Sequence, residues 1–174
     1  GAIANPDEGR MVGHYWLRDP KLAPTPEITN QIENVLAQIR SFEVEHVSTV
    51  LQIGVGGSGL GPELIYDALK RPDTRHFEVL NTVDPDAVET ILERIDPAST
   101  LVIVASKSGS TVETSIATDL VEAHYTAHGV SFADHAVAIT IPGSKLADRA
   151  QSWKAIFPMF DWVGGRTSVC SAVG

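Results

Sequence analysis

Apolar and polar positions along this chain follow two different periods. Short runs rich in Val, Ile and Leu, bounded by turn-forming residues, predict buried β-strands. These runs span residues 48–55, 76–83, 100–106 and 135–142. Segments in which apolar residues recur every three or four positions predict helices with one buried face. They span residues 61–70, 84–95, 111–128 and 144–153. Strands that alternate with helices predict an α/β, doubly wound fold, in which helices cover both faces of a parallel sheet.

Residues at the segment ends predict where helices begin and end. Thr25 and Pro26 are typical of an N-cap and a first helical position, so a helix is expected before the first strand. Pro62 is expected at the N-terminus of the next helix, and Asp84 is expected to cap the one after it. Gly129 is expected to end the helix at 111–128.

The chain of 174 residues is long enough for one domain with a sizeable core. Residues 1–26 show no clean period and carry several prolines, which predicts an extended lead-in segment. Its aromatic pair, Tyr15 and Trp16, is expected to pack onto the domain formed by residues 27–174.

Composition narrows the possible partners. The net charge of −9 argues against nucleic acid and against an anionic membrane surface. No apolar run approaches the roughly 20 residues of a membrane span. Cys170 is the only cysteine, which excludes an internal disulfide, fits a cytoplasmic location and predicts a small buried apolar side chain. His124 and His128 stand four apart on one helix, but without a third ligand they are expected to be solvated, so no metal is expected.

Three stretches follow, or can follow, the carboxyl ends of strands, where ligands bind in such sheets. In the first, residues 53–62, Gly54, Gly56 and Gly59 fit the G-x-G-x-x-G pattern of dinucleotide sites. The alternative is a glycine turn that only permits tight packing.

The second stretch, "SKSGSTVET" at residues 106–114, is dense in hydrogen-bond donors. Its hydroxyl groups, the start of the following helix and Lys107 together are suited to a phosphate. Ser110 and Glu113 have the spacing of a capping box, so Glu113 is expected to bond the backbone rather than to act as a base. In the third stretch, residues 161–174, the pair Gly164-Gly165 permits close approach of a ligand and Arg166 offers a guanidinium.

These three stretches, in this order, resemble the glucose-6-phosphate isomerase family. "GVGGSGLGP" is similar to the family's IGGSxLGP loop, "SKSGSTVET" to its SKTxTTxET phosphate loop, and "DWVGGRTSVCSAVG" to its VGGRxS signature. The resemblance covers about residues 50–174. It implies the sugar-isomerase (SIS) fold, which has a parallel five-stranded sheet with flanking helices.

The resemblance also implies an activity and a set of site residues. The reaction would interconvert glucose 6-phosphate and fructose 6-phosphate through a cis-enediol(ate), without a cofactor. Arg166 would stabilise the negative charge of the enediolate. The substrate-binding residues would be Gly57, Ser58, Ser106, Lys107, Ser108 and Thr111.

The chain departs from the family pattern in three ways. Ser108 and Ser110 stand where the family usually has threonines, a change that keeps both hydroxyl groups. Thr167 stands where the signature usually has an aromatic residue. The family's glutamate base, its lysine and its histidine, the last from the partner subunit of a homodimer, come from segments beyond the VGGR motif, whereas this sequence ends at Gly174. We therefore expect a phosphate-gripping domain that is inactive alone. The alternatives are a stand-alone phosphosugar-sensing SIS module and a dinucleotide-binding domain.

Overall fold

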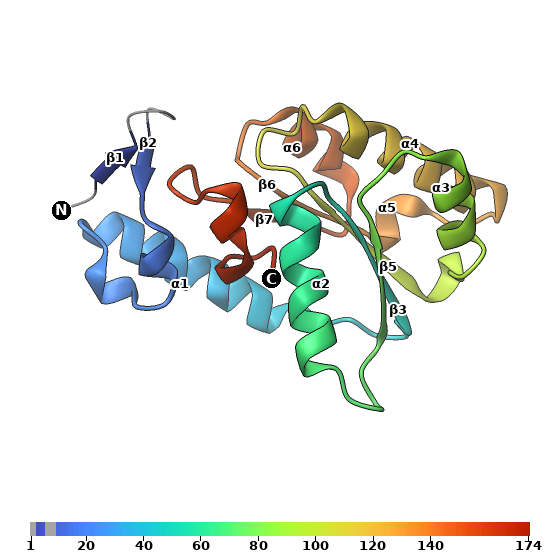
Figure 1. Cartoon of the computed structure of the whole chain (residues 1–174), viewed down its shortest axis with the longest axis horizontal. Helices are drawn as coiled ribbons and strands as arrows, with labels where there is room; N and C mark the ends of the chain where they lie inside the picture. The colour runs from blue at the N-terminus through green and yellow to red at the C-terminus, as the bar shows by residue number, and fades with distance from the viewer. Residues whose placement is uncertain (1–2, 6–9) are drawn as a thin grey trace.

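A parallel five-stranded sheet forms the centre of the molecule. The computed structural model describes residues 3–5 and 10–174 (Figure 1). The strands lie in the order β4-β3-β5-β6-β7 and all neighbours are parallel. Their bounds are β3 (Thr49–Ile53), β4 (His76–Leu80), β5 (Thr100–Ala105), β6 (Ala136–Thr140) and β7 (Ala155–Pro158). The predicted α/β class and five-stranded parallel sheet are confirmed.

The order of strands creates a switch point in the middle of the sheet. The chain passes from β3 outward to β4 and then back across β3 to β5. The connections that leave β3 and β5 therefore go to opposite faces of the sheet, and their loops diverge between the two strand ends. Open parallel sheets bind ligands at such a point.

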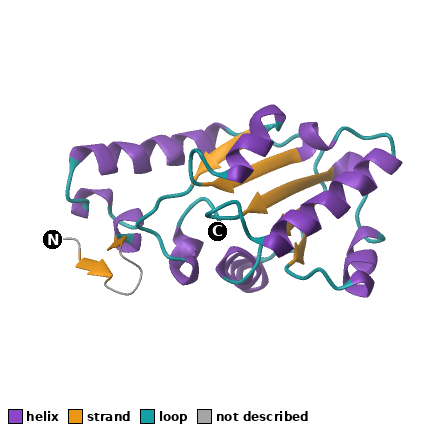
Figure 2. Cartoon of the chain, turned by 90° about the horizontal axis from the view of Figure 1, so that it is seen from above, coloured by secondary structure: helices purple, strands orange, loops and turns teal. Residues whose placement is uncertain are grey.

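Helices cover both faces of the sheet, as Figures 1 and 2 show. Helices α3, α4 and α6 pack on one face, whereas α1 and α2 lie on the other. The α-helices are α1 (Pro26–Ser41), α2 (Gly57–Leu69), α3 (Pro85–Leu92), α4 (Val112–Ala127), α5 (Phe132–His135) and α6 (Lys145–Arg149). The 3-10 helices in the described part of the chain are η1 (His14–Leu17), η2 (Pro20–Leu22), η3 (Pro97–Ser99), η4 (Ala150–Ser152) and η5 (Gly165–Cys170). None of the helices among the described residues is long and apolar enough to cross a membrane.

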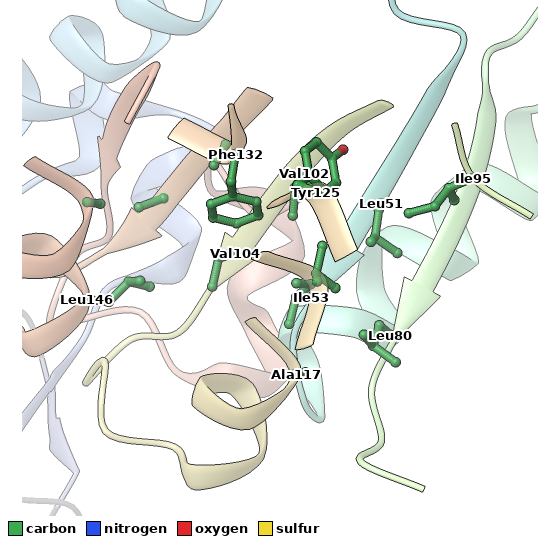
Figure 3. Packing of buried hydrophobic residues seen from close by; sticks show 14 of the residues in the cluster. Leu51, Ile53, Leu80, Ile95, Val102, Val104, Ala117, Tyr125, Phe132 and Leu146 are labelled. Carbon is green, nitrogen blue, oxygen red and sulfur yellow. The ribbon is translucent and has the colours of Figure 1, made fainter. Parts of the chain in front are cut away.

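The larger core lies between the sheet and helices α3 to α6 (Figure 3). Leu51 and Ile53 of β3 and Val102 and Val104 of β5 are completely buried there. Tyr125 of α4 is also fully buried, and its hydroxyl donates to the backbone oxygen of Thr100 at 2.9 Å. Burial raises the pKa of this phenol, so it stays a hydrogen-bond donor at physiological pH.

The lead-in packs on the domain through one of its two aromatic residues. Trp16 is 1% exposed, and its ring centroid lies 5.1 Å from that of Trp162. Tyr15 remains 39% exposed, so the expected packing holds for Trp16 but not for Tyr15. The lead-in contains the antiparallel pair β1 (Ile3–Asn5) and β2 (Arg10–Val12), followed by η1 and η2 rather than an extended chain. The part of the predicted segment at residues 1–2 and 6–9 lies outside the described residues.

Most of the expected helix ends are confirmed. Thr25 and Asp84 are the N-caps of α1 and α3. Gly129, at φ +70°, follows α4, and the N–H of Val130 bonds the oxygen of Tyr125, which completes a Schellman motif.

The expected position of Pro62 is wrong. Helix α2 begins at Gly57, so Pro62 lies inside it. The glycine run itself forms the first turn, because Gly56 adopts φ +59° and turns the chain sharply into the helix. Strand β7 was not predicted, because its run of four residues is short, ends in Pro158 and carries no alternation.

Candidate functional site

An open pocket of about 530 Å³ lies at the carboxyl ends of β3, β5 and β6, next to the switch point. The pocket brings together residues of all three predicted stretches. Ser58 comes from the first stretch, several residues between 106 and 114 come from the second, and Asp161 comes from the third. Its lining consists of Val55, Ser58, Ala105, Ser106, Lys107, Ser108, Thr111, Thr114, Ile141 and Asp161. Five of the seven site residues expected from the sequence are in this set.

The loop between β5 and α4 is shaped by its own hydroxyl groups. Ser106 Oγ accepts the N–H of Gly109 at 3.2 Å and donates to Thr111 Oγ1 at 3.4 Å. Ser108 Oγ accepts the N–H and the hydroxyl of Ser110 at 3.3 and 2.9 Å. Gly109 has φ +65°, and a Cβ there would lie 2.5 Å from the backbone nitrogen of Leu146. The loop therefore requires glycine at its tip.

The start of α4 leaves its first backbone N–H groups without a side-chain cap. The N-cap is Thr111, and its side chain makes no capping bond. The predicted capping box of Ser110 and Glu113 is therefore wrong, because the N–H of Ser110 instead donates to Ser108 Oγ. An uncapped N-terminus of a 16-residue helix presents free donors and the positive end of its dipole to the pocket.

Lys107 joins the second stretch to the third. Its Nζ donates to the backbone oxygens of Asp161 and Val163 at 2.6 and 3.0 Å, and lies 3.3 Å from Asp161 Oδ1. The ammonium thus lines the pocket with an acidic partner beside it, and the pair adds little net charge. An anion in this pocket would therefore be bound mainly by hydroxyl and backbone N–H groups.

Gly57 is packed against the third stretch rather than into the pocket. A Cβ at Gly57 would lie 1.9 Å from the oxygen of Gly165. Ser168, completely buried, has its hydroxyl 2.7 Å from the oxygen of Gly165 and 3.3 Å from that of Gly57. Ser58, the next residue, does line the pocket.

Arg166 is exposed and does not line this pocket. Its backbone nitrogen lies beside Gly57, 3.2 Å from the position of a Cβ there, so the third stretch starts next to the first. The role expected for its guanidinium stays a prediction, as do the roles of the other site residues.

Sequence reasoning missed Thr114 and Asp161. Thr114 lines the pocket and is 4% exposed, although no hydrogen bond involves its hydroxyl. Its spacing of three from Thr111 on one helix places both side chains on the same face, and that signal was available in the sequence. Asp161 gave no such signal, because only the fold brings it to Lys107.

The described residues contain no group of three or more His, Cys, Asp or Glu side chains that could hold a metal ion. The expectation that His124 and His128 are both solvated is wrong for His124. Its Nε2 is buried without a hydrogen-bond partner, and burial and the charge of His128 lower its pKa. Cys170 is exposed, so its expected burial is also wrong.

Comparisons with known proteins agree with this geometry. A family model described as phosphoglucose isomerase matches residues 1–174. The chain is 49% identical to a glucose-6-phosphate isomerase of Thermosynechococcus vestitus and 50% identical to one of Rippkaea orientalis. Each alignment covers 100% of this chain and 36% of the relative. A solved glucose-6-phosphate isomerase of Chlamydia trachomatis superposes with a TM-score of 0.88 at 32% identity, over 99% of this chain and 35% of that one. The chain thus spans about a third of the length of these relatives.

Proposed function

The chain belongs to the phosphoglucose isomerase family, and from this premise we propose that its pocket binds the phosphate of glucose 6-phosphate and fructose 6-phosphate. The observation that carries the proposal is the meeting of Ser58 with Ser106, Ser108 and Thr111 in one pocket at the switch point of the sheet. Three or more hydroxyl groups beside a helix N-terminus match the several acceptor oxygens of a phosphate.

The electrostatics of the pocket support neutral donors rather than a charge clamp. The chain carries a net charge of −9, so its overall field repels a phosphosugar. Asp161 offsets the charge of Lys107. Binding then depends on short-range hydrogen bonds from hydroxyl and N–H groups and on the dipole of α4, which act only at contact distance.

In the whole enzyme we propose an aldose–ketose isomerisation through a cis-enediol(ate). The phosphate rests on Ser106, Ser108 and Thr111, with the backbone of Lys107 beside them. Ser58 meets the sugar, and the substrate-binding role proposed for Gly57 is to hold Ser58 there through its packing against Gly165. Arg166 turns toward the reacting carbons and stabilises the enediolate charge, the kind of contact that contributes most when charge develops in the transition state. No cofactor takes part. The proton-transferring base, histidine and lysine come from the part of the enzyme that this chain does not span.

The proposal extends to assembly and location. We propose a homodimer for the full-length enzyme, as the family resemblance implies. Leu60, Leu64 and Leu69 of α2 are 60–70% exposed, and such an apolar surface supports contact with further protein. A single exposed cysteine, Cys170, supports a cytoplasmic location, because cytosolic proteins rarely depend on disulfides.

Calorimetric titration of the purified chain with fructose 6-phosphate tests the phosphate assignment. Wild type is expected to bind, and Thr111→Ala to bind about tenfold or more weakly, because it loses a hydrogen bond to a charged group. Thr126→Ala is the matched control, since Thr126 lies in the last turn of the same helix and its hydroxyl donates to the oxygen of Glu122, away from the pocket.

Two further readouts separate the alternatives. NADH binding in place of the sugar phosphate would favour the dinucleotide interpretation of the glycine loop and contradict the proposal. Wild type that binds no fructose 6-phosphate, or a Thr111→Ala variant that binds as well as wild type, would also contradict it. The chain by itself is expected to show no isomerase turnover.

A further inference from the structure

A buried amide lies under the loop that carries Ser58. Gln52 is 1% exposed and stands in the middle of the sheet, in β3. Its neighbours Leu51 and Ile53 belong to the core beneath α3 and α4. Because side chains alternate along a strand, Gln52 points to the other face, toward the start of α2. A buried polar side chain at such a place is costly unless it forms a hydrogen bond.

The partner of Gln52 is a carbonyl whose usual helical donor, the N–H four residues later, is absent. Residue 62 of the helix is proline, which has no N–H to donate to the oxygen of residue 58, four positions earlier. Gln52 Nε2 donates to this oxygen of Ser58 at 2.9 Å. Since the contacted atom is a carbonyl oxygen, the contacting atom of the side chain must be the amide nitrogen.

The glycines of the loop make this contact possible. A Cβ at Gly54 would lie 2.8 Å from the oxygen of Ser58, and one at Gly59 would lie 2.6 Å from the oxygen of Gly54. The first turn of α2 is therefore folded closely over the end of β3. Gln52 bonds it there from below, while the side chain of Ser58 faces the pocket above.

We propose that Gln52 is a positioning residue, which replaces the helical hydrogen bond removed by Pro62 and so fixes Ser58 at the ligand pocket. The inference rests on the proposed function for its ligand, but the hydrogen bond and its replacement can be tested without any ligand. Without the amide, the half-buried oxygen of Ser58 loses this donor, and the first turn of α2 opens more often.

Substitutions at Gln52 and Pro62 allow a rescue experiment. Gln52→Met keeps the length and burial of the side chain but removes the donor. Pro62→Ala restores a backbone N–H four residues after Ser58, so the helix again satisfies that oxygen. We expect Gln52→Met to speed hydrogen exchange of the Gly59 and Leu60 amides, which bond the oxygen of Gly56, by about tenfold. The half-buried oxygen of Ser58 has lost its donor in this variant, and that loss favours opening of the turn. The double variant Gln52→Met, Pro62→Ala is expected to return to within about threefold of wild type.

Binding gives the second readout. Calorimetry is expected to show about tenfold weaker fructose 6-phosphate binding in Gln52→Met and recovery in the double variant, because a misplaced contact group weakens binding without being removed. Inorganic phosphate, followed by NMR shifts of the 106–111 loop, is expected to bind wild type and Gln52→Met alike. Gln151→Met is the matched control, since Gln151 Nε2 also donates to a helical carbonyl, that of Ala147, at the same distance of 2.9 Å.

The outcomes separate the two proposals. Unchanged exchange in Gln52→Met, or exchange that Pro62→Ala does not restore, overturns the positioning role. Restored exchange in a protein that binds no sugar phosphate supports the positioning role and refutes the proposed ligand. If Gln52→Met fails to fold, the double variant decides, because a folded double variant supports the inference and an unfolded one overturns it.

Discussion

Replacing Gly57 by alanine tests whether the first and third stretches form one packed unit. An added Cβ would lie 1.9 Å from the oxygen of Gly165 and 2.5 Å from its carbonyl carbon. Both contacts are with backbone atoms, so no side-chain rotation relieves them. The turn that carries Gly165 and Arg166 must move away from α2, and the buried hydroxyl of Ser168 loses one of its two nearby carbonyls.

The expected magnitude is a balance of two effects. Overpacking of a well-packed site costs about 1–3 kcal/mol, and a clash with backbone belongs to the upper part of that range. The higher helix propensity of alanine offsets at most about 1 kcal/mol of this loss, and less at the first residue of a helix. We therefore expect Gly57→Ala to lower the free energy of unfolding by about 2 kcal/mol.

Urea denaturation followed by tryptophan fluorescence measures this loss, since Trp16 and Trp162 are both buried. With a slope of about 2 kcal/mol per molar urea, the midpoint should fall by about 1 M. Gly165→Ala is the matched control, because it adds the same methyl group on the other side of the contact between Gly57 and Gly165. A Cβ at Gly165 meets nothing within 4 Å, so its effect should stay within about 0.5 kcal/mol. A Gly57→Ala variant as stable as wild type, or an equal loss in Gly165→Ala, would refute the packing argument.

Two further predictions concern α4. Burial and then the charge of His128 lower the pKa of His124 below its ordinary 6.5, so below that pH the unfolded chain binds a proton that the folded chain resists. The free energy of unfolding should therefore fall faster with decreasing pH in wild type than in His124→Gln, and parallel urea-denaturation curves from pH 7.5 to 5 would contradict this. Tyr125→Phe should cost about 0.5–1.5 kcal/mol in the same assay, because it removes the bond to the oxygen of Thr100. The loss should be near the lower value, since His135 Nδ1 lies 3.2 Å from that oxygen, and a loss above about 3 kcal/mol would refute this account.

Local rules in the sequence predicted much of the sheet. The central strands β5 and β6 are nearly continuous apolar runs, as strands buried on both faces require, and β3 departs from that pattern at Gln52. Strand β7 was missed because its four residues, which end in Pro158, are too short a run to be told from a loop. Caps at Asp84 and Gly129 were predictable, since each depends on bonds to residues a few positions away.

Local rules were wrong where two local interactions compete. Pro62 is typical of a helix start, yet α2 begins five residues earlier, and a side chain from β3 donates to the carbonyl oxygen that Pro62 cannot serve. Ser110 and Glu113 have the spacing of a capping box, but the N–H of Ser110 donates to Ser108 Oγ instead of to Glu113. Neither outcome can be read from the spacing of residues alone.

The sequence by itself determined the alternation of strands and helices, the glycines that permit close turns, and the hydroxyl-rich stretch beyond β5. Each of these depends on residues near one another in the chain. Only the tertiary structure decided that Asp161 pairs with Lys107, that Gly57 faces Gly165 rather than the pocket, and that Arg166 stays outside it. These contacts join segments more than 50 residues apart, and their geometry is set by how strands order and helices pack, which no local pattern encodes.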